Sequence, residues 1–154
     1  MFKKLAIAAA LAVAASSSFA APTGVYAGLD LGSTKIDDVD DSKTSFGGFL
    51  GYGFNQFFSA EVGYRRLGKW DDVTVNQTQL SVVGSYPIAP QFDIFGRIGY
   101  NHLDIDNSFD GNRSGGLYGI GVSYTFTPNI SARFEVQKPT SDSTNYGVGI
   151  VYKF

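Results

Sequence analysis

The stretch FDIFGRIGY, residues 92–100, decides the fold class, because two kinds of residue alternate along it. Every second residue from Phe92 to Tyr100 is apolar or Gly, whereas Asp93 and Arg97 lie between them. A period of two is the period of a β-strand whose two faces meet different surroundings. The stretch therefore predicts a strand with one apolar face and one face that carries charges.

The same alternation recurs along the chain. It appears at residues 25–31, 46–54, 58–64, 80–86, 118–126, 130–136 and 146–154. The 19 Gly and 15% aromatic residues agree with strands, since Gly costs a helix about 1 kcal/mol relative to Ala and aromatic side chains favour β structure. The sequence thus predicts an all-β protein of eight strands.

The connections between these segments alternate in length. Short turns are predicted at residues 55–57, 87–91 and 127–129, and long polar loops at 33–43, 68–76, 102–115 and 138–144. Short turns at one end and long loops at the other are typical of an up-and-down antiparallel barrel, which in an outer membrane turns its long loops outward.

The composition of the two faces favours a membrane barrel over a soluble one. A soluble barrel would be charged outside, but the face opposite the apolar one is mostly Gly, Ser, Thr, Asn and Gln, which suits a polar lumen. A secreted β-sandwich is the alternative. Aromatic residues near the ends of the apolar face predict girdles at both bilayer interfaces: Phe46, Phe54, Tyr86, Phe92, Tyr100, Tyr118, Phe126, Tyr146 and Phe154.

The first twenty residues have the pattern of a cleavable signal peptide. Two lysines, Lys3 and Lys4, precede an apolar run over residues 5–15, and small or polar residues follow to Ala20. This order directs export, with cleavage expected before Ala21. We therefore divide the chain into a signal peptide, 1–20, and an outer-membrane β-barrel domain, 21–154.

Four segments resemble strands of the small outer-membrane barrels of the OmpA/OmpX type. They are FSAEVGYRRLG at 58–68, FDIFGRIGY at 92–100, ISARFEVQ at 130–137 and YGVGIVYKF at 146–154. The last is the most specific, since in that family the barrel assembly machinery reads a terminal Phe with aromatic or apolar residues at alternate positions before it. Tyr152 and Phe154 fit this assembly signal.

The resemblance implies an integral outer-membrane protein of a Gram-negative bacterium, monomeric and surrounded by outer-membrane lipid and lipopolysaccharide. Many family members carry a periplasmic peptidoglycan-binding domain after the barrel. Because this sequence stops at Phe154, that domain and its role are not expected here.

Charged residues on the polar face are predicted to line the lumen, four acids and four bases. A charge in a narrow lumen is partly desolvated and needs an opposite partner, so the balance predicts ion pairs. The candidates are Asp30, Glu61, Arg65, Asp93, Arg97, Arg133, Glu135 and Lys153. By resemblance, Glu61, Arg97, Arg133 and Glu135 match family positions where ion pairs occlude or gate a small pore. A packed polar core without transport is the favoured interpretation.

Other functional classes find little support. The net charge of -2 gives no basic footprint for nucleic acid, and the absence of Cys excludes a thiolate metal site. The acidic run of Asp37, Asp38, Asp40 and Asp41 is interpreted as a solvated loop, so no metal or cofactor is predicted. A lipid-modifying enzyme would need His102, the single histidine, and the sequence shows no nucleophile paired with it. We therefore predict that the protein is not an enzyme.

These observations predict an integral outer-membrane barrel with a structural, adhesive or surface-interaction role, carried by its long extracellular loops. The alternative is a narrow channel or small-solute pore occluded by lumen salt bridges. The sequence does not identify a surface ligand.

Overall fold

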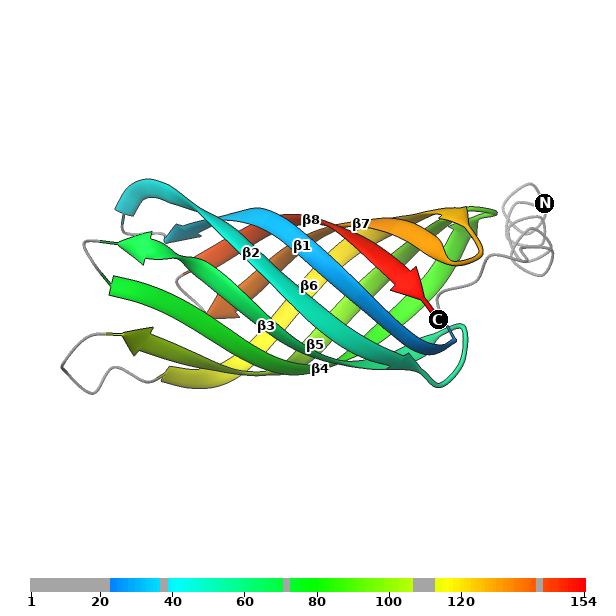
Figure 1. Ribbon diagram of the computed structural model, residues 1–154, viewed down its shortest axis with the longest axis horizontal. Coiled ribbons are helices and arrows are strands. Elements are labelled where there is room, and N and C mark those ends of the chain that lie inside the picture. Colours follow the sequence, from blue (N-terminus) through cyan, green and yellow to red (C-terminus); the bar gives the residue numbers. More distant parts are fainter. Residues whose placement is uncertain (1–22, 37–38, 71–72, 107–112, 141–142) are drawn as a thin grey trace, which may run out of the picture.

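The computed structural model describes residues 23–36, 39–70, 73–106, 113–140 and 143–154, and they form one closed antiparallel barrel (Figure 1). No helix among these residues is long and apolar enough to cross a membrane. The predicted eight-stranded up-and-down barrel is confirmed. Its strands are β1 (Gly24–Ile36), β2 (Val39–Gly53), β3 (Phe58–Trp70), β4 (Val73–Ala89), β5 (Phe92–Asp106), β6 (Arg113–Thr127), β7 (Ile130–Thr140) and β8 (Ser143–Lys153).

Each strand pairs with its neighbour in the chain, and β8 pairs with β1 to close the wall. In the closing pair, Tyr152 lies opposite Ala27, and the backbone N–H of Phe154 donates a hydrogen bond to the carbonyl of Val25 at 3.1 Å. Closure pairs the backbone N–H and C=O groups of β1 with those of β8. A bilayer requires this pairing because its core offers no water that could bind such groups.

Short turns join the strands at one end of the barrel, where the C-terminus also lies (Figure 1). In the β2–β3 turn the side-chain oxygen of Asn55 accepts hydrogen bonds from the backbone N–H groups of Phe57 and Phe58, at 2.8 and 2.9 Å. Asn is favoured in turns for this ability to bond its own backbone. The predicted short connections are thus found, although residues 87–89 belong to β4.

The long loops predicted at the opposite end are wrong, because the strands continue through most of those residues. Strand β1 ends at Ile36 and β2 begins at Val39, and the gaps from Trp70 to Val73 and from Thr140 to Ser143 are equally short. The gap between β5 and β6, residues 107–112, is longer. Beyond the bilayer both faces of a strand can be polar, so the alternation that reveals a strand disappears while the strand itself continues.

The outer wall presents an apolar band between two rows of aromatic residues. Leu29, Leu80, Ile98 and Ile120 in the band are 64–73% exposed, which no soluble surface of this extent would tolerate but lipid tails would cover. The upper aromatic row, away from the short turns, comprises Phe46, Tyr64, Tyr100, Tyr118 and Tyr146. The lower aromatic row comprises Tyr52, Phe54, Phe58, Tyr86, Phe92, Phe126, Tyr152 and Phe154.

Inside the barrel, large side chains lie across glycines of neighbouring strands. A Cβ atom built on Gly51 would lie 2.2 Å from the ring of Tyr26, and one on Gly28 would lie 2.2 Å from the ring of Phe49. Tyr26, Phe49 and Val151 form a buried cluster toward the turn end. Glycine is therefore needed at these two positions because an aromatic ring occupies the place of a side chain.

Candidate functional site

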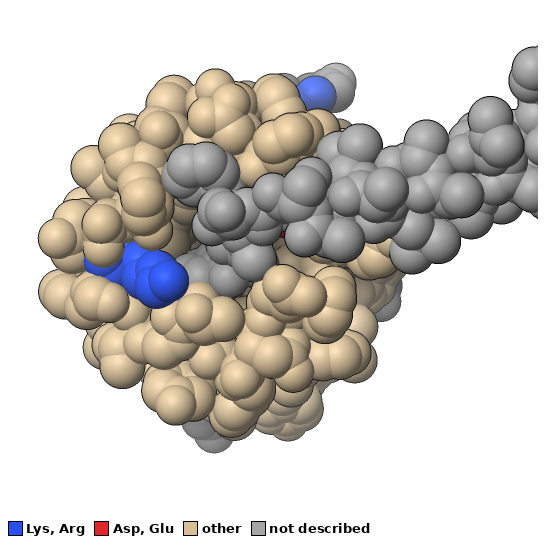
Figure 2. All heavy atoms as spheres, turned by 90° about the vertical axis from the view of Figure 1, so that its right-hand side faces the viewer, with Lys and Arg blue, Asp and Glu red and all other residues tan. Residues whose placement is uncertain are grey.

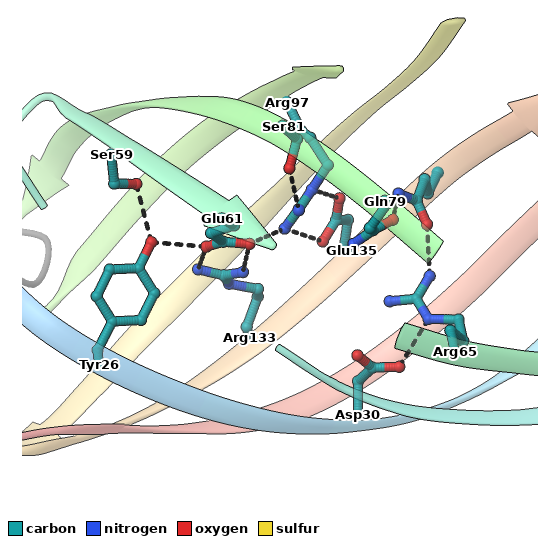
Figure 3. Close-up of polar contacts among 11 residues, drawn as sticks. Tyr26, Asp30, Ser59, Glu61, Arg65, Gln79, Ser81, Arg97, Arg133 and Glu135 are labelled. Carbon is teal, nitrogen blue, oxygen red and sulfur yellow. Dashed lines mark hydrogen bonds and ion pairs between the residues drawn. The ribbon is translucent and has the colours of Figure 1, made fainter. Parts of the chain in front are cut away.

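Glu61 on β3 is the centre of a charge cluster that crosses the lumen (Figure 3). Its carboxylate is fully buried and accepts hydrogen bonds from three side chains. The guanidinium of Arg133 on β7 donates to both oxygens, at 2.9 and 3.2 Å, and Arg97 on β5 donates at 2.5 Å. The hydroxyl of Tyr26 donates at 2.7 Å. Four strands thus meet at one carboxylate.

Arg97 extends the cluster to a second acid. Its side chain is 1% exposed, and it bonds Glu135 on β7 through Nε at 2.7 Å and through a terminal nitrogen at 3.2 Å. Its other terminal nitrogen donates to the hydroxyl of Ser81 at 2.8 Å. The five donors of a guanidinium suit such a site, because one side chain can bond several acceptors in a plane.

Arg133 is also held by two aromatic rings. Its guanidinium carbon lies 4.8 Å from the ring centroid of Phe49 and 4.7 Å from that of Phe95. Rings at this distance attract a cation through their negative faces. The Arg133 guanidinium is therefore positioned by the two rings as well as by its hydrogen bonds to Glu61.

Arg65 is the centre of a second polar group, further from the turn end. Its Nε donates to the carboxylate of Asp30 on β1 at 2.8 Å, and its Nη1 donates to Gln137 and, at 3.1 Å, to Asn145. The amide of Asn145 continues the chain of bonds to Ser45 and Thr34. Polar side chains thus fill the lumen above the Glu61 cluster as well.

Two of the eight predicted lumen charges remain outside these pairs. Asp93 faces inward and is buried, but its nearest partner is the Ser123 hydroxyl at 3.5 Å. Lys153 is half-buried, and its ammonium has no ion-pair partner in the described part of the chain. The predicted balance of four acids and four bases is therefore wrong as a pairing scheme. The structure joins three acids with three arginines.

The uncharged members of the network were missed as site residues, although alternation placed them on the inner face. The sequence feature that could have identified them is their spacing, because they are polar residues with long or hydroxyl side chains at every second position of a strand. The residues in question are Tyr26, Ser59, Gln79, Ser81, Gln137 and Asn145.

His102 has a nearby hydroxyl that the sequence did not reveal. Its Nδ1 lies 2.9 Å from the Oγ of Ser114, and its Nε2 lies 3.2 Å from the carboxylate of Asp104. His102 and Ser114 are direct cross-strand partners of β5 and β6, so the ladder itself brings them together. All three lie on the outer face near the strand ends, and His102 and Asp104 are 44% and 52% exposed.

The predicted acidic run lies largely outside the described residues. Asp37 and Asp38 are in an undescribed gap, and the backbone of Asp40 and Asp41 belongs to β2. Among the side chains that the structure places, no three His, Cys, Asp or Glu residues gather as a metal site would require.

The Glu61 and Arg65 groups together cross the lumen from wall to wall. Their members are almost inaccessible to solvent, with Glu61, Arg97 and Gln137 at 1–2% exposure. An eight-stranded barrel is only wide enough for side chains to fill its interior. The arrangement can therefore brace the barrel and block its lumen.

Comparison with known proteins gives consistent matches. Residues 5–154 match the family described as "Outer membrane protein beta-barrel domain". Outer membrane protein A of Yersinia pseudotuberculosis is 30% identical over 196 residues, covering 99% of this chain and 56% of that protein. Outer membrane protein A of Shigella flexneri is 31% identical over 166 residues, covering 88% and 48%. The chain thus spans about half the length of these relatives.

Solved structures share the fold at low identity. The N-terminal β-barrel domain of Pseudomonas aeruginosa OprF aligns with a TM-score of 0.62 and 18% identity, covering 87% of this chain and all of that domain. A de novo designed transmembrane β-barrel aligns with a TM-score of 0.67 and 19% identity, covering 87% and 98%. The family match over residues 5–154 and the curated relatives show that the chain belongs to the outer membrane protein β-barrel domain family and is an integral protein of the outer membrane.

Proposed function

We propose that this protein is a closed structural barrel of the outer membrane that presents the ends of its strands at the cell surface. The observation that carries the proposal is the Glu61 cluster, in which a fully buried carboxylate joins side chains from opposite walls. Charges held in this way brace the wall, and the side chains that carry them obstruct a water path through the lumen.

The surface role belongs to the strand ends rather than to long loops. Above the upper aromatic row the outward side chains are polar and exposed, among them Lys35, Arg66, Thr78, Asp104 and Ser114. Strands that extend beyond the bilayer hold such side chains in a fixed pattern, which a flexible loop would not do. A surface partner would therefore meet a rigid rim.

Single-channel recording tests the closed state. Purified protein in planar bilayers is expected to give no stable open level, because the lumen is filled by bonded side chains. A steady ion current from wild-type protein at moderate voltage would contradict the proposal. A designed or natural open porin, inserted in the same bilayers, serves as the control for successful recording.

A gated channel is the second candidate, and Asp93 is the observation that favours it. Asp93 and Arg133 are both register partners of Ser123, and Asp93 is a buried acid without a cationic partner among the side chains that the structure places. Arg133 could exchange Glu61 for Asp93 and so open a path. If this occurs, Glu61→Ala should conduct and Glu61→Ala combined with Asp93→Asn should conduct less. If neither variant conducts ions, the gated channel is rejected and the closed barrel remains the proposed function.

We also propose that Tyr152 and Phe154 form the signal read by the barrel assembly machinery. Phe154 is 73% exposed, and its ring lies 5.3 Å from that of Tyr152 in an edge-to-face arrangement, so both rings are available on the outer face. Deleting Phe154 should slow assembly in cells while changing the urea stability of refolded protein little. Equal slowing by Phe126→Ala, an exposed aromatic of the same row, would argue for a general hydrophobic effect instead.

The closed wall further supports a monomer. Closure leaves no unpaired strand edge for a second copy. Light scattering of the protein in detergent should give the mass of one chain, and a defined dimer would refute this inference.

A further inference from the structure

The wall of the barrel divides into two sheets at the rim. Above the upper aromatic row β3, β4, β5 and β6 stay paired with one another, and so do β7, β8, β1 and β2. The pairing of β2 with β3, however, ends at Phe46 and Arg66, and that of β6 with β7 ends at Tyr118 and Lys138. Among the described residues these strands form no further pair with each other, although all four continue upward. We call the two parts the β3–β6 sheet and the β7–β2 sheet, and the two divisions between them the seams.

Each seam has a cause in the sequence of one strand. On β7, Pro139 has no N–H to donate to β6, and the register of β7 with β8 shifts between Gln137 and Thr140. On β3, the register with β4 shifts between Arg66 and Gly68. A proline or a bulge of this kind ends the pairing of a strand with its neighbour. The two sheets therefore separate where the chain itself interrupts the ladder.

The same strands stay together at the turn end. There β2 and β3 are paired down to Gly53 and Ser59, and β6 and β7 down to Thr127 and Ile130. Figure 2 looks onto this end, and its described surface consists almost entirely of uncharged residues, so that few like charges repel one another. Movement of the two sheets relative to each other is therefore confined to the rim.

Hydrogen bonds inside the lumen cross from one sheet to the other. On the β3–β6 sheet, Gln79 accepts a bond from Gln137 of β7 at 2.8 Å. Two residues nearer to the rim on β7, the backbone carbonyl of Pro139 accepts a bond of 2.7 Å from the side-chain amide of Asn101 on β5. Asn101 is 1% exposed. This bond spans the β6–β7 seam, because its donor and its acceptor belong to different sheets.

We propose that Asn101 is a latch that holds the two sheets of the rim together. While its bond to Pro139 is made, the mouth of the lumen stays closed over buried polar side chains such as Ser45 and Gln77. When the bond breaks, the sheets part at the rim and water enters, while the Glu61 cluster below keeps its bonds. The latch thereby fixes the surface-exposed rim proposed above, but it acts whether or not a partner binds there.

Gln77 makes the parted state accessible. It is fully buried on β4, and neither atom of its side-chain amide has a hydrogen-bond partner in the part of the chain that the structure describes. A buried polar group without a partner is destabilising, and water that enters between the parted sheets relieves this cost. A single bond such as that of Asn101 therefore has a measurable effect on the balance between the two states.

Cysteine labelling tests the latch, because the chain has no cysteine of its own. Ser45→Cys reports on the rim from β2, on the other sheet from Asn101, and Ser81→Cys reports on the level of the Glu61 cluster. Both serines are buried, at 0% and 2% exposure, and each accepts a side-chain hydrogen bond. A small methanethiosulfonate reagent reaches such a cysteine only when the site opens, so at low reagent concentration the labelling rate follows the open fraction. Without any change at Asn101, Ser45→Cys should already react faster than Ser81→Cys in protein folded in lipid vesicles, and the reverse order would contradict the proposal.

Asn101→Leu removes the donor, and Asn101→Asp removes it while keeping the shape of the side chain. Loss of one hydrogen bond should raise the labelling rate at Ser45→Cys about fivefold and leave that at Ser81→Cys unchanged. Ser114→Ala is the matched control, because it removes a contact of 2.9 Å with His102 that lies at the rim but inside one sheet. It should change neither rate.

Folding of each variant is checked by the mobility shift of unheated protein on gels. A wild-type labelling rate at Ser45→Cys in either folded Asn101 variant would overturn the proposal. An equal rise at Ser81→Cys would show that the whole barrel is loosened, and an equal rise in Ser114→Ala would show that any lost contact loosens the rim. Either result would also refute the latch.

Discussion

The Glu61–Arg133 pair inside the barrel and the Asp104–His102 contact on its outer rim have similar geometry. The nitrogen–oxygen distances are 2.9 and 3.2 Å. Their surroundings differ: Glu61 and Arg133 are 0% and 10% exposed, whereas Asp104 and His102 are 52% and 44% exposed. Removing one partner inside leaves a charge that water cannot readily solvate, and removing one outside does not. The free energy of unfolding that is lost on removing one partner should therefore depend on the burial of a polar contact rather than on its distance.

The largest effect is expected for Glu61→Ala, which leaves Arg97 and Arg133 close together without their shared acid. Breaking a buried pair typically costs about 3 to 5 kcal/mol, and water entering the lumen should hold the loss near the lower value. The free energy of unfolding by urea in lipid vesicles is the measurement. A loss below about 1 kcal/mol is what exposed contacts give, and it would contradict the claim that burial makes the Glu61 contacts more important for stability.

Arg133→Lys is expected to cost less, about 2 kcal/mol, because the charge remains. Lysine cannot bond both oxygens of Glu61 in one plane or stack between Phe49 and Phe95. The same unfolding assay measures this, with Lys153→Arg as a control at a position without an ion pair. Wild-type stability in Arg133→Lys would mean that charge alone holds the cluster.

Asp30→Asn tests the intermediate case and should cost about 1 to 2 kcal/mol. Asp30 and Arg65 are 11% and 7% exposed, and Arg65 keeps Gln137 and Asn145 when the carboxylate is lost. A loss as large as that of Glu61→Ala would show that the upper group is as critical as the lower one.

The smallest effect is expected for His102→Ala and Asp104→Ala, each within about 1 kcal/mol of wild type. Both side chains are solvated when unpaired. Ester hydrolysis by detergent-solubilised protein is assayed alongside, and we expect none. Activity that disappears in both His102→Ala and Ser114→Ala would instead assign a catalytic role to the rim.

The parts predicted from sequence are those where the two faces of a strand differ. Between the aromatic rows, lipid demands apolar side chains and the lumen tolerates polar ones, so residues such as Ile98 and Arg97 alternate and reveal the strand. Beyond the upper row both faces are polar, and residues 33–36 or 102–106 look like loops although they are strands. Alternation is a signal of contrasting environments, and it ends where the contrast ends.

The pairing of the lumen charges could not be predicted in the same way. Register within a strand gives the face of Glu61 or Asp93, but not the height of one strand relative to a strand across the barrel. Glu61 meets Arg133 across 72 residues of sequence because the strand tilt and the closure of the wall bring them to one level. Asp93 has no cationic partner among the described residues for the same reason, although the predicted lumen set holds as many acids as bases.

A double-mutant cycle on Glu61 and Arg133, run beside a cycle on His102 and Asp104, tests the central claim most directly. Each cycle compares the urea unfolding free energies of the two single alanine variants and the double variant in lipid vesicles. We predict a coupling of about 1.5 to 3 kcal/mol for the buried pair and below about 0.5 kcal/mol for the exposed pair. Charge reversal of both buried partners should recover part of the loss. Coupling within error of zero for Glu61 and Arg133, or equal coupling in the two cycles, would contradict the account.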